Sequence, residues 1–497
     1  MILFLLGLGL LVVSAPLAFL HRSIAAWGGM LGASLALLPS LSALLGHSLE
    51  LSLPWSVPLG SFSLGLDPLS AFFLLPTLAL SVLAAFYGTG YLKTEVKGPW
   101  CFFNLLVATM ALVLTARNGM LFLMAWVGMA IASFLLVTTE HERPEVQRAG
   151  WIYLVATHLG TAVLLLFFTI LAQCAGSLDF SKIELLRTLP ANELFLLALV
   201  GFGMKAGFLH LHVWLPEAHP AAPSHVSALM SGVMIKTGIY GLVRTLTWLG
   251  APPAWWGYLL IGIGLSSGIL GVLFALAQHD LKRLLAYHSV ENIGIITLGL
   301  GLGTLGVALH SVPMAVLGFG GGLFHVLNHA LFKGLLFLGA GSVLHGSGTL
   351  ELDRLGGLLK SMPWTGYTFL VGAVAISGLP PLNGFASELL IYAGAFHGLF
   401  TPSQALLPLA GLVGLALIGG LATACFTKAF GIVCLGEPRQ ALPPVHENRR
   451  MSLSMGILAL ACFLASFLAL PIFKLLLPAI APITGMKLSI LAGTFPA

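Results

Sequence analysis

Charged residues are scarce in this chain. Of its 497 residues, 22 are Lys or Arg and 17 are Asp or Glu, so that only 8% are charged, while 58% are hydrophobic. Soluble domains have about 25% charged residues. The composition therefore excludes a soluble globular protein and indicates a chain embedded in a lipid bilayer. The small net charge of +5 is spread over the loops, which argues against nucleic-acid binding.

Cysteine is also scarce, and no two cysteines have the C-x-x-C spacing. The five lie far apart, at Cys101, Cys174, Cys425, Cys434 and Cys462. This spacing indicates neither an iron–sulfur cluster nor a zinc knuckle. We therefore expect no metal site and no cofactor, and we expect any redox chemistry to belong to partner subunits.

No polar stretch is long enough to fold as a soluble domain. The longest polar loops are 139–149, 345–363 and 436–451. Apolar runs of about 20 residues, the length that spans a bilayer, follow one another instead. They predict an all-α polytopic membrane protein of about fourteen transmembrane helices. The expected spans are 1–20, 24–46, 68–89, 101–116, 119–138, 150–173, 194–215, 224–247, 256–278, 288–307, 314–344, 364–398, 405–435 and 452–477.

Two segments near the N-terminus need separate interpretation. The region from His47 to Asp67 alternates in polarity and contains prolines, so we expect an extracytoplasmic hairpin there. Met1 to Leu20 has the length of a signal peptide, but it lacks a basic region and leads directly into another span. We expect it to be a retained helix.

The distribution of Lys and Arg over alternate loops predicts the orientation. With the N-terminus outside, the cytoplasmic loops carry about 12 of these residues and the opposite loops about 6, as the positive-inside rule requires. We therefore expect both termini outside the cytoplasm. The cell membrane of a bacterium or an archaeon, the inner one where there are two, is the expected location.

Two of the expected spans, 194–215 and 364–398, are interrupted and lie five helices apart. That separation is typical of two inverted five-helix repeats, in which discontinuous helices line an ion site at the membrane midplane. We expect the first break at Pro216, Pro220 and Pro223. The expected division is 1–100 for three N-terminal helices with the hairpin, 101–247 and 256–435 for the two repeats, and 452–497 for a C-terminal helix and tail.

Lysines inside the apolar spans are the first candidate functional residues. Lys205 follows the apolar run ELFLLALVGFGM, and Lys236 lies within VSALMSGVMIKTGIYGLV. An ionisable group inside a bilayer costs roughly 2.5–3.5 kcal/mol on insertion scales and usually faces a bundle interior or water. We interpret both as members of a proton path. The structural alternative is a side chain that reaches the interface or pairs locally.

A third group lies in FHVLNHALFKGLLFL. His325, His329 and Lys333 are spaced i, i+4, i+8 and therefore share one helix face. Histidine can accept and donate a proton near neutral pH, which favours a proton relay. Two other interpretations stay open. One is hydrogen-bonded packing, and the other is a metal site, which the absence of a Glu in an H-E-x-x-H pattern disfavours.

Glu388, in SGLPPLNGFASELLIY, is the candidate for an exit or gate, with a counter-ion role as the alternative. Asp280, Lys282 and Arg283 are interpreted as solvated cytoplasmic charges that precede the next span. The possible inlet or accessory residues are His212, Glu217, His219, His288 and Glu291.

Three motifs together resemble a known family. They are KAGFLHLHVWLPEAHPAAPSHVSALMSG, HDLKRLLAYHSVENIGI and SGLPPLNGFASE. Over about 67–435 the chain is similar to the antiporter-like subunits of respiratory complex I, Mrp antiporters and energy-converting hydrogenases. It most resembles the hydrogenase-4 component B and formate hydrogenlyase subunit 3 branch. The resemblance implies fourteen helices with two inverted repeats, other membrane and peripheral subunits as partners, and redox chemistry elsewhere in the complex.

The resemblance also implies roles for single residues. Lys205 matches the lysine of the broken helix, Lys236 the connecting lysine, and Glu388 the residue at the second broken helix. His325, His329 and Lys333 match the central relay.

The chain departs from the family at one position. Family members usually have a glutamate after the tryptophan of the fifth helix, which pairs with the broken-helix lysine. Here the run is AWVGMAIASFLLV, so Val127 follows Trp126. Glu140 and Glu142 are the nearest carboxylates, and both lie in the following loop.

Three functions therefore remain open. The first is a proton-translocating subunit of a membrane oxidoreductase complex, with no redox centre of its own. The second is a structural subunit with a disabled first channel. The third is a Mrp-type Na+/H+ antiporter module.

Overall fold

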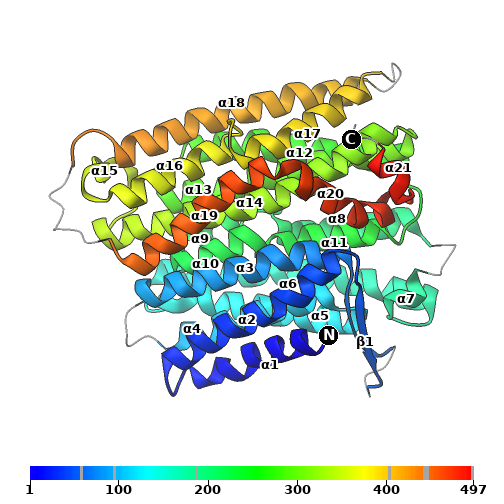
Figure 1. Ribbon diagram of the computed structural model, residues 1–497, viewed down its shortest axis with the longest axis horizontal. Helices are drawn as coiled ribbons and strands as arrows, with labels where there is room; N and C mark the ends of the chain where they lie inside the picture. Colours follow the sequence, from blue (N-terminus) through cyan, green and yellow to red (C-terminus); the bar gives the residue numbers. More distant parts are fainter. Residues whose placement is uncertain (56–59, 93–96, 185–188, 401–404, 440–446, 494–497) are drawn as a thin grey trace.

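The computed structural model describes the chain except residues 56–59, 93–96, 185–188, 401–404, 440–446 and 494–497. Its helices run roughly along the long axis of the molecule (Figure 1). Within the described residues, eleven helices are long and apolar enough to cross a membrane, and Ile2–Leu17, Pro363–Ile376 and Ala469–Thr484 are shorter apolar helices. The prediction of an all-α polytopic membrane protein is confirmed.

The helices and strands, in chain order, are α1 (Ile2–Leu17), α2 (Arg22–Leu44), β1 (Leu49–Leu53), β2 (Phe62–Leu66), α3 (Pro68–Tyr91), α4 (Gly98–Thr115), α5 (Gly119–Val137), η1 (Thr138–Glu140), α6 (Pro144–Ala175), α7 (Phe180–Ile183), α8 (Ala191–Ala206), α9 (Leu215–Ala221), α10 (Ser224–Leu229), η2 (Met230–Met234), α11 (Lys236–Leu246), α12 (Ala254–Leu276), α13 (Leu281–Ala308), α14 (Val312–Ser347), η3 (Leu352–Arg354), α15 (Leu358–Ser361), α16 (Pro363–Ile376), α17 (Asn383–Gly398), α18 (Leu406–Cys434), α19 (Arg449–Phe467), α20 (Ala469–Thr484) and α21 (Leu488–Ala492).

Every expected span corresponds to one of these helices or to a consecutive set of them, although several boundaries differ; α6, for example, begins at Pro144 rather than at 150. α13 begins at Leu281 rather than at 288, because the Asp280 carboxylate accepts a hydrogen bond from the Arg283 N–H at 2.8 Å and caps the helix there. The last expected span, 452–477, is two helices, α19 and α20, on either side of Leu468. The expected hairpin is the antiparallel pair β1 and β2.

Both expected interruptions are present. α8 ends at Ala206, and Gly207 and His210 follow with φ of 82° and 69°. The first break thus spans residues 207–214. The expectation that it would lie at the prolines was wrong. Pro216 lies in the first turn of α9, where its missing N–H costs no helical hydrogen bond. The second break separates α16 from α17.

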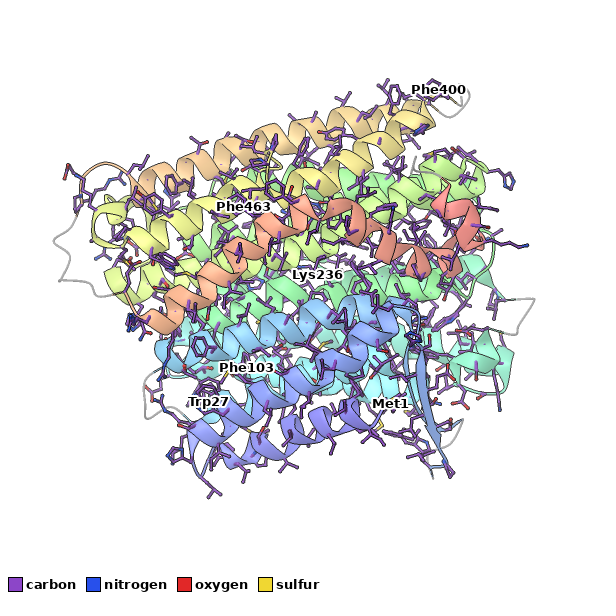
Figure 2. The ribbon with its side chains drawn as sticks, in the orientation of Figure 1. Met1, Trp27, Phe103, Lys236, Phe400 and Phe463 are labelled. Atoms are coloured by element: carbon purple, nitrogen blue, oxygen red, sulfur yellow. The ribbon has the colours of Figure 1, made fainter. Side chains whose placement is uncertain are left out.

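A third irregularity divides the span expected over 224–247. Met230–Met234 is a π-helical turn between α10 and α11, in which the Ile235 N–H bonds to the Met230 carbonyl at 3.1 Å. A π turn is rare, and it frequently marks a functional site. Here it lies directly before Lys236, near the centre of the molecule (Figure 2).

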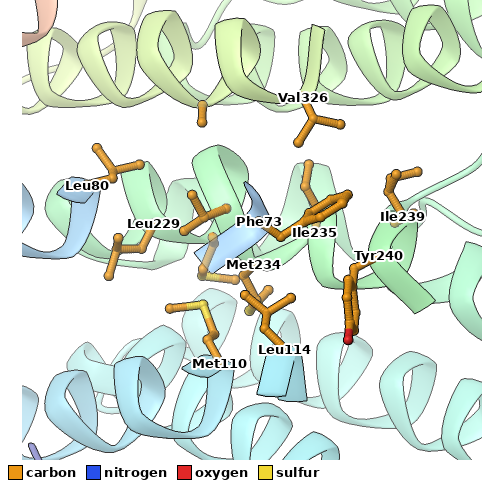
Figure 3. Close-up of a cluster of buried hydrophobic side chains, with 14 of the residues drawn as sticks. Phe73, Leu80, Met110, Leu114, Leu229, Met234, Ile235, Ile239, Tyr240 and Val326 are labelled. Atoms are coloured by element: carbon orange, nitrogen blue, oxygen red, sulfur yellow. The ribbon is translucent and has the colours of Figure 1, made fainter. Parts of the chain in front are cut away.

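An apolar cluster packs around this turn, and it includes Met110, Leu114 and Met234 (Figure 3). Leu80 of α3 inserts at its edge between two glycines. A Cβ on Gly232 would lie 2.4 Å from a Leu80 methyl group, and one on Gly334 would lie 2.6 Å from the other. Only glycine therefore allows α3, η2 and α14 to approach this closely.

The hairpin, α7 and α21 lie at the same end of the molecule as the start of α1 (Figure 1). The start of α1 and the helix α21 therefore lie at the same end of the bundle. Which side of the membrane that end faces, and the division into two inverted repeats, stay predictions.

Candidate functional site

Besides Lys282 and Arg244, which are described below, ten Lys, His and Glu side chains of the described residues are buried inside the helix bundle, and none of them is more than 5% exposed. They are Lys205, His219, His225, Lys236, His288, Glu291, His325, His329, Lys333 and Glu388. They come from the broken helices α8–α9 and α17, from α10 and α11, and from the two central helices α13 and α14. All six residues of the predicted proton path are among them.

Lys205 occupies the last turn of α8, directly before the first break. Its Nζ donates a hydrogen bond to the Tyr153 hydroxyl at 2.9 Å and lies 5.9 Å from the centre of the Trp126 ring. In the described part of the chain, no carboxylate forms an ion pair with Lys205. The hydrogen-bond partner of Lys205 is therefore a neutral hydroxyl group rather than a carboxylate.

The π turn provides the partners of Lys236. Its Nζ donates to the Ser231 and Gly232 carbonyls, each at 2.6 Å. The turn makes the Ser231 carbonyl available, because the Ile235 N–H bonds one residue further back, to Met230. The π turn therefore forms a carbonyl site for the lysine that follows it.

Two serines connect Lys236 to Lys333. The Ser231 hydroxyl lies 2.8 Å from the Ser289 hydroxyl, which donates to the Leu285 carbonyl at 3.2 Å. The Lys333 ammonium donates to the same Leu285 carbonyl. A continuous series of hydrogen bonds therefore joins η2 to α13 and α14.

A second polar network surrounds His325. Its Nε2 lies 3.0 Å from the Asn292 Oδ1, so Nε2 is the donor, and its Nδ1 lies 2.9 Å from the Ser387 hydroxyl. Asn292 donates in turn to a Glu291 carboxylate oxygen at 2.7 Å, and His288 Nδ1 lies 2.7 Å from the same oxygen. The network joins α13, α14 and α17.

Sequence reasoning missed the amides in this network. Asn328 donates to the Asn383 carbonyl at 2.7 Å and to the Ser387 hydroxyl at 2.9 Å, and Asn383 donates back to the Asn328 side chain at 3.1 Å. All three residues are fully buried. Their sequence signal is weak. Asn328 and Ser387 each stand one position before a predicted site residue, and Asn383 is on the same helix as Glu388.

His329 and His219 have no hydrogen-bond partner on either ring nitrogen within the described residues. The His219 ring lies 4.9 Å from the Phe337 ring, and the Lys333 ammonium lies 5.6 Å from the centre of that same ring. Both imidazoles can therefore take up or release a proton without breaking a hydrogen bond.

Glu388 lies beside the second break. A Cβ on Gly378 would be 2.4 Å from a Glu388 carboxylate oxygen, so the glycine lets the carboxylate approach the backbone of the break. Among the hydrogen bonds of the described residues, none involves the Glu388 carboxylate. The structure places it next to the interruption, where we expected it.

The accessory residues are dispersed. Glu217 forms an ion pair with Arg283 at the partly exposed end of α9, and half-buried His212 lies in the first break, 6.0 Å from the Tyr287 ring. His288 and Glu291 lie within α13 instead of beginning it. They are therefore part of the internal network rather than of a surface inlet.

The interpretation of Lys282 as a solvated charge was wrong. It is 1% exposed, and its Nζ donates to the Ala222 carbonyl at 2.7 Å. Together with Tyr91, Arg143 and His345, it lines an open cavity of about 460 Å³. The cap at Asp280 turns Lys282 inward, because it extends α13 beyond the expected start.

Arg244, counted among the loop charges, is also buried at the far end of α11. It forms two hydrogen bonds, at 2.7 and 2.8 Å, with Asp67, which also pairs with Arg117 at 3.2 Å. Burial alone would raise the pKa of Asp67, but the charges of Arg117 and Arg244 outweigh burial and hold it below its usual range. This ion pair fixes the start of α3 to the end of α11.

No group of three His, Cys, Asp or Glu residues within the described ranges lies close enough to hold a metal ion. The buried polar side chains instead contact each other and backbone carbonyls. The arrangement suits proton transfer between titratable groups.

Comparisons with known proteins identify the family of the chain. Residues 116–414 match the family model described as NADH:quinone oxidoreductase/Mrp antiporter, transmembrane. The chain is 42% identical to hydrogenase-4 component B of Escherichia coli over 82% of its length, and 36% identical to formate hydrogenlyase subunit 3 of the same organism over 93%. It spans 62% and 77% of those two proteins.

Solved structures share the fold. One chain of the Mrp complex from Dietzia sp. DQ12-45-1b superposes with a TM-score of 0.85 at 18% identity, covering 99% of both chains. A chain of the membrane-bound sulfane sulfur reductase, an archaeal respiratory membrane complex, gives 0.78 at 28% identity, covering 92% of this chain and 75% of that one. These relatives are subunits of membrane complexes. The chain belongs to the NADH:quinone oxidoreductase/Mrp antiporter family of transmembrane subunits.

Proposed function

We propose that this chain is a proton-translocating, antiporter-like subunit of a membrane oxidoreductase complex of the hydrogenase-4 or formate hydrogenlyase type. The observation that carries the proposal is the series of contacts from Lys236 through Ser231, Ser289 and the Leu285 carbonyl to Lys333. Burying an amine at mid-membrane depth costs free energy, and a role in proton transport would account for that cost. Redox chemistry takes place in partner subunits.

The serine pair determines how a proton passes between the two lysines. A hydroxyl group both accepts and donates a hydrogen bond, whereas a carbonyl only accepts. Lys236 and Lys333 are each held on carbonyls, so neither can pass its proton while it stays there. Transfer requires the Lys236 ammonium to leave its carbonyls for the Ser231 hydroxyl, and Ser289 then relays the proton toward Lys333.

Protons rather than sodium ions are the proposed cargo. The carbonyls of the path already accept hydrogen bonds from Lys236 and Lys333, and its other groups are imidazoles, amides and hydroxyls. Glu291 and Glu388 are its two buried carboxylates in the described chain. Cation channels use rings of carboxylates or carbonyls, whereas ammonium groups repel cations. A sodium ion would have to displace these groups, but a proton can bind to them.

A second candidate function rests on the surroundings of Lys205. With Val127 on α5, the partner of Lys205 is the neutral Tyr153 hydroxyl instead of a carboxylate. A charge pair that opens and closes beside Lys205 is then missing. In this alternative the first half is a structural unit, and Lys236, Lys333 and Glu388 conduct without it.

The test uses vesicles that contain the whole complex and measures proton uptake per redox turnover. Lys236→Met and Glu388→Gln are expected to reduce uptake about tenfold, because each removes a proton-carrying group. Lys474→Met, at an exposed lysine of α20, is the matched control and is expected to leave uptake unchanged. Normal uptake in both path variants, with the complex intact, would contradict the proposal.

Two further arms separate the alternatives. Val127→Glu is expected to raise uptake if the missing carboxylate limits the first half, and Lys205→Ala is expected to have no effect if that half is inactive. Transport that requires sodium and persists without a proton carrier in proteoliposomes would favour the Mrp-type exchanger.

A further inference from the structure

A small cavity lies where α2, α4 and α19 begin and α3 ends. Its volume is about 40 Å³, and its lining consists of Arg22, Ser23, Ala26, Trp27, Thr89, Trp100 and Arg450. A single water needs roughly 10–15 Å³ of such space. The cavity therefore has room for a larger polar group, and it is separate from the proton path.

The polar groups that line this cavity share one property. Two are guanidinium groups and two are indole N–H groups, all of which only donate hydrogen bonds, and the others are hydroxyls. No carboxylate is among the described residues of the lining. The cavity therefore fits an anion that accepts several hydrogen bonds, and it repels a cation.

Trp100 gives independent support for a ligand. Its side chain is 1% exposed, and its Nε1 has no hydrogen-bond partner in the described chain. The ring is held in place by contacts with Phe103 and His225, at 6.2 and 6.3 Å between ring centres. Buried N–H groups nearly always have an acceptor. The protein does not supply one here, so an acceptor from outside the chain explains the position.

The surroundings of the cavity indicate what else the ligand contains. Exposed apolar side chains line the membrane face next to it, namely Trp27 (58%) and Leu31 (54%) on α2 and Leu453 (53%) and Ile457 (42%) on α19. α3 packs against both helices and lies between them (Figure 1). Trp27 itself lies near the end of the bundle (Figure 2). A ligand in this position would contact charged groups in the cavity and apolar side chains along the adjoining surface of α2 and α19.

We propose that this cavity binds the phosphate group of an anionic phospholipid. The phosphate lies between Arg22 and Arg450 and accepts a hydrogen bond from Trp100 Nε1, while the acyl chains run along α2 and α19. Basic pockets between helix ends bind phospholipid headgroups in this way, and interfacial tryptophans lie at headgroup depth. Free phosphate has the same chemistry as the headgroup, but it has no acyl chains to contact the exposed apolar side chains of α2 and α19.

The test titrates the delipidated, detergent-purified complex with phosphatidylglycerol and counts bound lipids by native mass spectrometry. Arg22→Gln and Arg450→Gln are each expected to weaken binding roughly fivefold. Trp100→Phe keeps an aromatic ring but removes the indole N–H, and it is expected to weaken binding about fivefold as well. Arg449→Gln removes the neighbouring charge, which does not line the cavity, and is expected to leave binding unchanged.

Two results would overturn the proposal. One is equal lipid affinity in Arg449→Gln and in the Arg22→Gln/Arg450→Gln double variant. The other is saturation of the site by millimolar inorganic phosphate with no lipid retained, which would identify a soluble anion as the ligand. Because a phenyl ring is smaller than an indole, the assembly of each variant complex is checked by gel filtration, which separates loss of binding from loss of folding. Proton uptake is not part of the readout, so the outcome is independent of the proposed transport function.

Discussion

The hydroxyl groups of Ser231 and Ser289 connect lysines that belong to different parts of the chain. We expect Ser289→Ala to lower proton uptake up to about tenfold, because a buried hydrogen bond contributes on the order of 1 kcal/mol and its loss leaves Lys236 without a relay. The measurement is dye-detected uptake in vesicles. Thr297→Val is the control, because the Thr297 hydroxyl bonds only within its own helix, to the Ile293 carbonyl. Equal uptake in both variants would remove the serines from the path.

Asp67 gives a prediction for stability and its pH dependence. Asp67→Asn keeps the cap of α3 but leaves Arg244 without its carboxylate, which costs about 3 kcal/mol for a largely buried pair. Because the folded pKa of Asp67 is held low, the wild-type advantage is complete above about pH 4, the ordinary value for an aspartate. It is lost as the pH falls toward the folded pKa.

Thermal unfolding in detergent at pH 7 and pH 3 measures both parts of this prediction. Asp353→Asn, at an exposed residue that pairs with His279, is the control and is expected to unfold like the parent. An Asp67→Asn protein that is as stable as the parent at pH 7 would show that the pair contributes nothing.

The sequence predicts the charged residues of the site better than the neutral ones. Lys205, Lys236 and Lys333 stand out because a lysine in an apolar run has a large cost that needs a reason. Ser289, Asn328 and Asn383 do not stand out, because small polar side chains also occur in ordinary helix packing. Lys282 was misassigned for another reason. Its burial depends on where α13 begins, and boundaries are the least reliable part of a helix prediction.

At the scale of a helix, the first break depends on Gly207. With φ of 82° and a Cβ position only 2.1 Å from a Leu215 methyl group, Gly207→Ala has both backbone strain and a steric clash. We expect it to lower the free energy of unfolding by about 3 kcal/mol. Gly176→Ala, at φ of 64° with open space around it, has the strain alone and is expected to cost about 1 kcal/mol. Equal costs in thermal unfolding would show that the contact with Leu215 is not tight.

The spans themselves were predictable, since about 20 apolar residues between polar loops leave few alternatives. The breaks were predictable in existence but not in position. The prolines around Pro216 led us to place the first break there. A proline in the first turn is compatible with a helix, however, and the chain leaves the helical conformation at Gly207 instead. The π turn at Met230–Met234 has no sequence signal, because it depends on packing between α3 and α14.

For the whole molecule, the native cysteines offer a test of orientation. Of the five, Cys174 is exposed, near the end of α6 that lies beside α7, and the other four are buried. We expect a membrane-impermeant maleimide to label intact cells at Cys174 alone, because the loop charges place this end outside. Cys174→Ser should abolish that labelling. A Cys174→Ser/Arg148→Cys protein should react only in inside-out vesicles, and the reverse pattern would invert the orientation.

Leu80 belongs to α3, outside either expected five-helix repeat, yet it fills a notch in η2 at Gly232 and another in α14 at Gly334. A polypeptide cut after residue 100 would therefore yield two pieces with complementary unfilled surfaces. Neither piece would be a finished folding unit, and co-expression should let them reassemble. α3 would thus act as a packing partner common to the two expected repeats.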